Sequence, residues 1–277
     1  MSHLSDIGFA FTKPEELFTF IEQVVNVPGN ERLATFSGYY IVWQADGTGP
    51  ELWIQAKHNL QLVGCALHFS GEGRTRFHVT QTETSPENSM DGTLYGWLNP
   101  SDETSPYSGD FPLLLASPDL EIVGAGVLEY PVVTVQIAAF VEVSLQCYPT
   151  EDADGDEDLA DCFEPATESG DDAPGSTPHA HIRGRVVNFE RRTNPATNLD
   201  FYWLLVTVPG GTVDMVVDPA LVAETLSIGS IVEARCWLSA KVVSAFPRSI
   251  GLTPKVSGFR IRRLARANVR NQQNSGA

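Results

Sequence analysis

The sequence has no apolar stretch long enough to cross a membrane as a helix. Such a helix needs about 20 consecutive apolar residues. Four residues interrupt the nearest approach, 122–145: Glu129, Pro131, Gln136 and Glu142. The first residues, Met1 to Asp6, offer neither the basic start nor the apolar stretch of a secretory signal. We therefore expect no membrane partner and a cytoplasmic location.

Cysteine is scarce, and no CxxC pair is present. The four cysteines are widely spaced at Cys65, Cys147, Cys162 and Cys236. This spacing predicts neither a disulfide framework nor a zinc knuckle, and free, mostly buried thiols are the expected state. A metal site at Cys65, His68 and His78 lacks an evident fourth ligand, so we favour ordinary packing roles for all three.

Sequence motifs of catalysis are also lacking. The chain has no phosphate-binding loop of the Walker type, no GxSxG elbow and no HExxH pair. We therefore expect no cofactor. An enzyme with a site in the N-terminal half remains open as the least favoured hypothesis.

Positive charge is scarce and unevenly placed. The chain has 18 Lys and Arg against 35 Asp and Glu, a net charge of −17. Residues 1–150 hold 5 bases and 18 acids, residues 151–177 hold no base and 11 acids, and residues 178–277 hold 13 bases and 6 acids. A basic final third indicates an anionic partner for that part, and the acidic segment of the same chain is one candidate.

The length of 277 residues favours two domains. We predict an acidic α+β domain over residues 1–148, an acidic disordered linker over 149–178, a basic domain over 179–265 and a basic tail over 266–277. The linker combines dense negative charge with Pro, Gly and Ser. Its apolar island of Leu159, Cys162 and Phe163 is either a docking point or a chance cluster, and we favour the second.

The N-terminal half is predicted to be mainly β. A strand at Ile7 to Phe11 precedes a helix that begins near Pro14 with Thr12 as its N-cap, followed by apolar residues at helical spacing. Residues 38–44 and 51–56 indicate a hairpin. Further strands are expected at 60–69, 75–82, 93–98, 121–128 and 132–148, and long loops at 84–118.

The C-terminal half is predicted to form a small barrel. Strands at 181–192, 201–208 and 212–218 are followed by a short helix at Pro219 to Leu226 and strands at 230–243 and 256–265. This order resembles a five-stranded OB-like barrel, and Gly184 suits a tight bend in its first strand. The predicted fold class is therefore mainly β, in two domains, with an OB-like C-terminal domain.

The candidate binding site combines basic and aromatic residues. OB-like barrels bind single-stranded nucleic acid by stacking bases on exposed aromatic rings beside a cationic groove, with about 1–3 kcal/mol per stacked base. The alternative is that the aromatic rings fill the barrel and the arginines lie solvated outside it. The candidate residues are Arg183, Arg185, Arg191, Arg192, Tyr202, Trp203, Arg235, Lys241, Arg260, Arg262 and Arg263.

The functional expectation is a non-enzymatic binding or adaptor protein whose basic OB-like domain engages an anionic ligand. Single-stranded nucleic acid is one such ligand, and an acidic protein surface is another. The alternative is a protein-interaction module that acts through the acidic N-terminal half, including its loops at 84–118.

Overall fold

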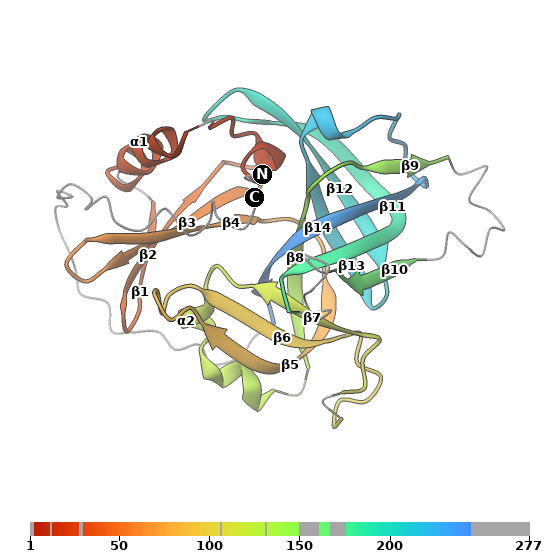
Figure 1. The fold of residues 1–277 in the computed structure, drawn as a ribbon, viewed down its shortest axis with the longest axis horizontal. Helices are drawn as coiled ribbons and strands as arrows, with labels where there is room; N and C mark the ends of the chain where they lie inside the picture. Colours follow the sequence, from red (N-terminus) through yellow and green to blue (C-terminus); the bar gives the residue numbers. More distant parts are fainter. Residues whose placement is uncertain are drawn as a thin grey trace.

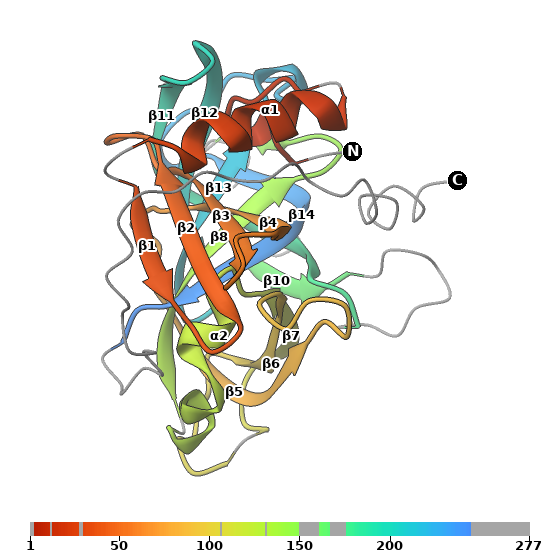
Figure 2. The ribbon, with the colours of Figure 1, turned by 90° about the vertical axis from the view of Figure 1, so that its left-hand side faces the viewer.

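The protein is mainly β and contains two sheets, one of four strands and one of ten. The computed structural model describes residues 3–11, 13–27, 30–105, 107–130, 132–149, 161–166 and 176–244. The four-stranded sheet and helix α1 lie on one side of the molecule and the ten-stranded sheet on the other (Figure 1). Figure 2 shows α1 running across the end of the four-stranded sheet.

The four-stranded sheet is an antiparallel meander covered by one helix. Its strands are β1 (Glu31–Ala34), β2 (Gly38–Gln44), β3 (Pro50–Lys57) and β4 (Leu62–Phe69), and α1 spans Pro14–Val25. The predicted hairpin and helix are thus confirmed, although Thr12 lies outside the described residues. The strand predicted at Ile7 to Phe11 was wrong: the chain makes a 3-10 turn, η1 (Ser5–Ile7), and Gly8 follows at a φ of 76°, which extended backbone cannot adopt.

The ten-stranded sheet takes strands from both halves of the chain. Its N-terminal strands are β5 (Thr75–Thr84), β6 (Gly92–Leu98), β7 (Phe111–Ala116), β8 (Val133–Val141) and β9 (Gln146–Tyr148). Its later strands are β10 (Cys162–Pro165), β11 (His179–Asn194), β12 (Leu199–Val208), β13 (Gly211–Val217) and β14 (Ile231–Val242). Most of the predicted strands are present, but β7 lies where a long loop was expected.

Two predicted elements between strands also differ. The strand expected at 121–128 is helical, with α2 (Leu120–Val123) and η2 (Ala125–Glu129) separated by Gly124 at a φ of 60°. The helix expected at 219–226 is a single 3-10 turn, η4 (Pro219–Leu221). Its predicted cap is confirmed, because the Asp218 carboxylate accepts a hydrogen bond of 2.9 Å from the Ala220 N–H. The strand expected at 256–265 lies outside the described residues.

Five strands pair in a closed circuit that includes one strand from the N-terminal half. In order they are β11, β12, β13, β8 and β14, and β14 pairs back to β11. We call this circuit the five-strand ring. β8 pairs parallel with β13 and antiparallel with β14. Because β8 belongs to the N-terminal half, the predicted division into two domains is not confirmed.

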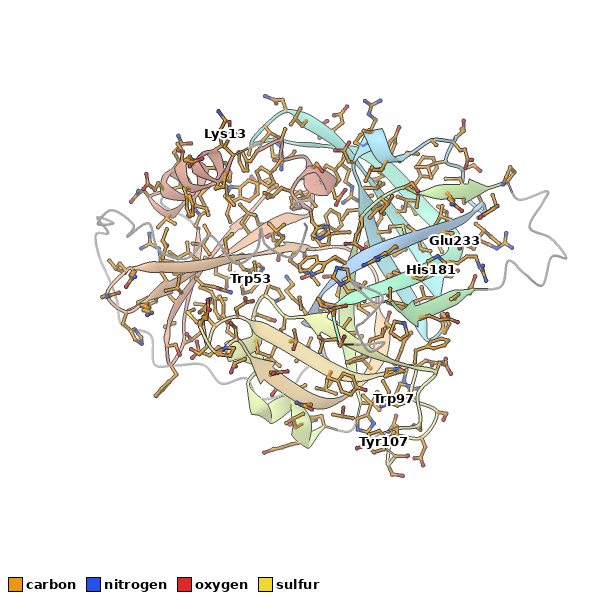
Figure 3. The ribbon with its side chains drawn as sticks, viewed as in Figure 1. Lys13, Trp53, Trp97, Tyr107, His181 and Glu233 are labelled. Atoms are coloured by element: carbon orange, nitrogen blue, oxygen red, sulfur yellow. The ribbon has the colours of Figure 1, made fainter. Side chains whose placement is uncertain are left out.

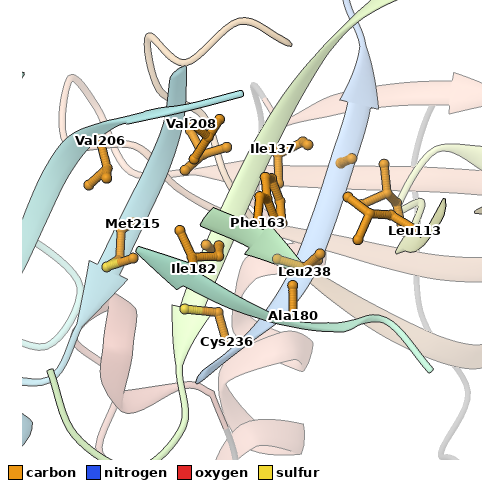
Figure 4. Close-up of a cluster of buried hydrophobic side chains, with 14 of the residues drawn as sticks. Leu113, Ile137, Phe163, Ala180, Ile182, Val206, Val208, Met215, Cys236 and Leu238 are labelled. Carbon is orange, nitrogen blue, oxygen red and sulfur yellow. The ribbon is translucent and has the colours of Figure 1, made fainter. Parts of the chain in front are cut away.

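One apolar core spans the predicted domain boundary. It joins Leu98 and Leu113 to Ile182 and Leu238, and Phe163 of β10 is fully buried among them (Figure 4). β10 pairs with β11, from Cys162 opposite Arg183 to Pro165 opposite Ala180. The disordered linker was therefore wrong at residues 161–166, because the apolar island supplies a core side chain. The remainder of 150–175 lies outside the described residues.

Candidate functional site

Each of the six described basic candidates already has a partner in the chain. Five make ion pairs with carboxylates: Arg183 with Glu233 at 3.7 Å, Arg191 with Asp200 at 2.8 Å, Arg192 with Glu190 at 2.8 Å, Arg235 with Glu142 at 2.7 Å and Lys241 with Glu51 at 2.8 Å. The sixth, Arg185, donates to the Gly229 carbonyl at 2.7 Å. Arg260, Arg262 and Arg263 lie outside the described residues.

The two aromatic candidates differ in exposure. Trp203 is fully buried, and the Arg192 guanidinium lies 4.0 Å from its ring centroid. Tyr202 is half-buried, with the Arg191 guanidinium 6.0 Å from its ring centroid. Trp203 therefore fills the core and cannot serve as a stacking platform in this conformation.

A buried carboxylate organises the polar groups around Trp203. Asp214 of β13 accepts hydrogen bonds from the Trp203 Nε1–H at 2.9 Å and from the Gln136 amide at 2.7 Å. It also accepts from the backbone N–H groups of Glu72 and Gly73, both at 2.9 Å. Burial raises the pKa of Asp214 in spite of these donors. A Cβ at Gly71 would lie 2.1 Å from the Asp214 Oδ1 atom, so the 71–73 loop requires glycine to reach the carboxylate.

The same network continues to a buried histidine. His68 Nε2 lies 2.7 Å from Gln136 Oε1, and His68 Nδ1 lies 2.9 Å from Ser239 Oγ. Because Gln136 uses its amide N–H groups on Asp214 and on the Phe69 carbonyl, its oxygen faces the imidazole, and Nε2 carries the proton. Burial lowers the pKa of His68 to about 3, so the ring is neutral at pH 7.

This serine–histidine pair joins the two sheets and is closed to a substrate. Both His68 and Ser239 have 0% exposure. Both ring nitrogens of His68 are engaged, which leaves none for the metal site considered with Cys65 and His78. Within the described residues, no group of three or more His, Cys, Asp or Glu side chains is placed to hold a metal ion. All four cysteines are free thiols, two of them buried and two half-buried.

A hollow of about 220 Å³ lies at one end of the five-strand ring. It is lined by η1, the end of β8, η4 and β14, and its polar residues are His3, Ser5, Asp6, Glu142 and Arg235. Burial raises the pKa of Asp6. Burial also acts to raise the pKa of Glu142, but His179 and Arg235 outweigh it and lower this pKa.

Carboxyl groups with oppositely displaced pKa values occur at acid–base sites. In this hollow, however, His179 holds Glu142 Oε1 at 3.2 Å and Arg235 holds Glu142 Oε2 at 2.7 Å. Glu142 is therefore a neutralised structural charge, and it is not free to take a proton from a ligand.

A second surface lies on the outer side of β5 and β6. Trp97 of β6 is half-buried and pairs in register with His78 of β5, and Tyr107 of the following loop contacts the Trp97 ring edge-on at a centroid distance of 6.2 Å (Figure 3). The Nε1 atom of Trp97 and the Nδ1 atom of His78 are buried and have no hydrogen-bond partner among the described residues. Sequence reasoning did not single out this surface. Successive side chains of a strand point to opposite faces, so Trp97 points away from the face that buries Leu94 and Leu98. This alternation is the sequence signal that could have indicated the outer position of Trp97.

Comparison with protein-family models, with curated proteins and with solved structures finds no match to this chain. In the part of the chain that the structure describes, no helix is both long enough and apolar enough to cross a membrane.

Proposed function

We propose that the chain is a non-enzymatic binding or adaptor protein with an OB-like barrel as its scaffold. Its ligand is anionic, with single-stranded nucleic acid as the first candidate. The five-strand ring supports the barrel, since it joins β11, β12, β13 and β14 in a circuit that β8 completes. In this proposal β8 takes the place that the sequence had predicted for residues 256–265.

The usual ligand face of such a barrel is unavailable in this protein. OB-like barrels bind oligonucleotides on the face of their second and third strands. Here those strands are β12 and β13, and their side chains Trp203 and Val216 pack in one core with Phe9 of the N-terminal segment and Ile54 of β3. A ligand would have to displace the four-stranded sheet to reach this face, so the proposed anion-binding group lies elsewhere.

The observation that carries the proposal is the separation of charge. Residues 178–244 hold 6 bases and 6 acids, whereas residues 245–277 hold 7 bases and no acid. The described part of the final third is thus electrically balanced, and its cations are paired. The excess positive charge belongs to the last 33 residues. We assign the anion-binding role to Arg260, Arg262, Arg263, Arg266 and Arg270.

The test is a salt titration of oligothymidylate binding by the full chain, followed by fluorescence anisotropy. If five arginines each neutralise one phosphate, the logarithm of the binding constant falls against that of salt with a slope of about −3.5. Changing Arg260, Arg262 and Arg263 to Ala reduces this slope by about 2. The control, Arg191→Ala, leaves it unchanged. Absence of binding at low salt, or an unaltered slope in the triple variant, would contradict the proposal.

The second candidate is a protein-interaction module in the N-terminal half. The exposed Tyr107 beside Trp97 favours it, because both lie within residues 84–118, the region predicted to present a binding surface. Tyr107→Ala separates the two functions. If the N-terminal half is a protein-interaction module, this substitution abolishes complex formation with a protein partner and leaves oligonucleotide binding intact.

A further inference from the structure

The walls of the hollow at one end of the five-strand ring are joined to one another by hydrogen bonds. The Glu142 N–H, just after β8, donates to the Arg235 carbonyl of β14 at 3.0 Å. The Asp6 carboxylate of η1 accepts from the Asp218 N–H, next to η4, at 3.1 Å. The hollow is therefore preformed, as most small-molecule sites are.

Arg235 presents two uncommitted donor groups to this hollow. Its Nε–H donates to Glu142 Oε2 at 2.7 Å, and the other oxygen of Glu142 lies 3.2 Å from His179 Nε2. No hydrogen bond joins Nη1 or Nη2 of Arg235 to any described residue. Because the guanidinium is planar, the bond at Nε also sets the direction of both terminal groups. The Arg235 side chain is 35% exposed and lines the hollow, so a ligand can reach it.

The acidic groups of the hollow, in contrast, are already engaged. Both oxygens of Glu142 face the two side chains named above. The Asp6 side chain is only 3% exposed, and its oxygens face His3 and a backbone N–H. The hollow therefore offers donors to a ligand: the terminal groups of Arg235 and the hydroxyl of Ser5. The two parallel N–H groups of a guanidinium match the two oxygens of a carboxylate.

The rest of the lining is apolar and limits the size of the ligand. Val141, Val143 and Leu221 form this part, and Val143 is 67% exposed. An apolar wall beside a few placed polar groups is the usual composition of a small-molecule site. The volume of about 220 Å³ corresponds to about seven groups of the size of a water molecule, at about 30 Å³ each.

We propose that this hollow binds a small aliphatic monocarboxylate. The carboxylate lies end-on to Nη1 and Nη2 of Arg235 and accepts a further hydrogen bond from the Ser5 hydroxyl. The carbon chain covers Val143 and Leu221. The site lies apart from the arginines of residues 245–277, so it does not depend on the proposed function.

The probe is pentanoate, which has the required size. Titration of the full chain is followed by NMR in the methyl resonances of Val143 and Leu221, which report both the affinity and the place of binding. We expect a dissociation constant of about 1 mM. Pentanamide has the same shape without the charge, and it should bind at least about tenfold more weakly. Absence of pentanoate binding, or equal affinities for the two compounds, would overturn the site.

A charge at the rim tests the location. Val143→Glu places an acid beside the carboxylate and removes little buried area, because this side chain is 67% exposed. Pentanoate affinity, read from the Leu221 methyl groups, should fall about tenfold or more. The matched control is Ile228→Glu, which changes a residue that is 65% exposed and lies before β14, and it leaves the affinity unchanged. Equal affinities in the two variants would overturn the location.

Arg235→Lys tests the contact itself. Lysine keeps a cation beside Glu142 but replaces the planar fork with a single ammonium group. Pentanoate should bind about tenfold more weakly, while urea denaturation shows that the variant is folded. Wild-type affinity in this variant would overturn the end-on contact, and the rim variants decide the site independently if the lysine variant fails to fold.

Two further ligands identify the source of the carboxylate. Acetyl-glycyl-leucine carries it at the end of a peptide, and tighter binding than that of pentanoate would overturn the assignment to a free acid. Inorganic phosphate offers the charge without the carbon chain. Phosphate affinity equal to that of pentanoate would overturn the role of the apolar wall, whereas binding at least about tenfold weaker supports it.

Discussion

Two tryptophans occupy opposite situations in this molecule. Trp203 of β12 is fully buried, and its indole N–H donates to Asp214. Trp97 of β6 lies on the outer side of the sheet, and its buried Nε1 has no partner in the part of the chain that the structure describes. The first belongs to a network that also satisfies Gln136 and His68. The second lies under an acidic loop with an exposed tyrosine.

The two tryptophans differ in what their buried N–H groups contribute to the fold. A buried polar network in which each group has a partner holds two sheets in one arrangement. The Trp97 donor, which has no acceptor among the described residues, makes no such contribution. The polar network whose groups all have partners thus lies between the two sheets, whereas the Trp97 donor lies beside Tyr107.

The largest expected effect is at the centre of the Trp203 network. Asp214→Ala removes the acceptor of four N–H groups, including that of Trp203. Each buried donor left without an acceptor costs about 1–3 kcal/mol, so the loss of Asp214 should cost about 3–5 kcal/mol in total. Urea denaturation should show a loss of this size, against less than about 0.5 kcal/mol for the control Asp46→Ala, which changes an exposed acid. A loss under 1 kcal/mol would contradict the structural role assigned to Asp214.

Trp203→Phe should lower the free energy of unfolding by about 2–3 kcal/mol. Phenylalanine keeps much of the buried ring but cannot donate to Asp214, and a hydrogen bond to a charged group contributes about 1.5–3 kcal/mol. The measurement is again urea denaturation. A loss equal to that of the same change at Trp97 would remove the distinction between the two tryptophans.

The buried histidine predicts acid sensitivity. Burial holds the pKa of His68 at about 3, compared with 6.5 for the ordinary group. Between these values the unfolded chain binds a proton that the folded chain excludes, so the free energy of unfolding falls by about 1.4 kcal/mol for each pH unit below 6.5. At pH 5 the loss attributable to His68 is about 2 kcal/mol.

Comparing denaturation at pH 7 and pH 5 isolates this effect. His68→Asn should reduce the difference between the two free energies of unfolding by about 2 kcal/mol, whereas the exposed His58→Asn should leave it nearly unchanged. An unaltered difference in the His68 variant would mean that the imidazole is not excluded from protonation in the folded chain.

The smallest expected effect is at Trp97. Trp97→Phe deletes a donor that has no acceptor among the described residues, so its removal relieves a desolvation penalty and offsets the lost contact area. Thermal and urea denaturation should give a change within about 0.5 kcal/mol. A loss above 2 kcal/mol would show that this indole N–H is already satisfied.

Many of the strands could be predicted from local sequence patterns. The strand pairings that close the five-strand ring could not. Alternation and turn residues placed the β2–β3 hairpin and β11 to β14. β7 was missed because prolines and glycines surround it, and β10 was missed because acids surround its single core residue, Phe163. The pairing of β8 with β13 and β14 joins residues 76 to 107 positions apart, and no local pattern encodes such a pairing.

The candidate site shows the same limit. The described basic candidates lie on strands, as the sequence predicted. Their ion-pair partners, however, lie far away along the chain. Lys241 pairs with Glu51, 190 residues away, and Arg235 with Glu142, 93 residues away. A count of charges by segment therefore overstated the free positive charge of the barrel. The excess over residues 245–277 could still be found from the sequence alone.

The position of β8 also affects how the protein is made. β8 ends at Val141, and its partner β14 begins at Ile231, 90 residues later. At ribosomal rates of about 5–20 residues per second, β8 waits roughly 5–18 s for that partner. During this interval the nascent chain exposes an apolar strand edge, which is the feature that recruits chaperones and promotes aggregation. Slow translation between these two strands would therefore lower the yield of folded protein without changing any residue.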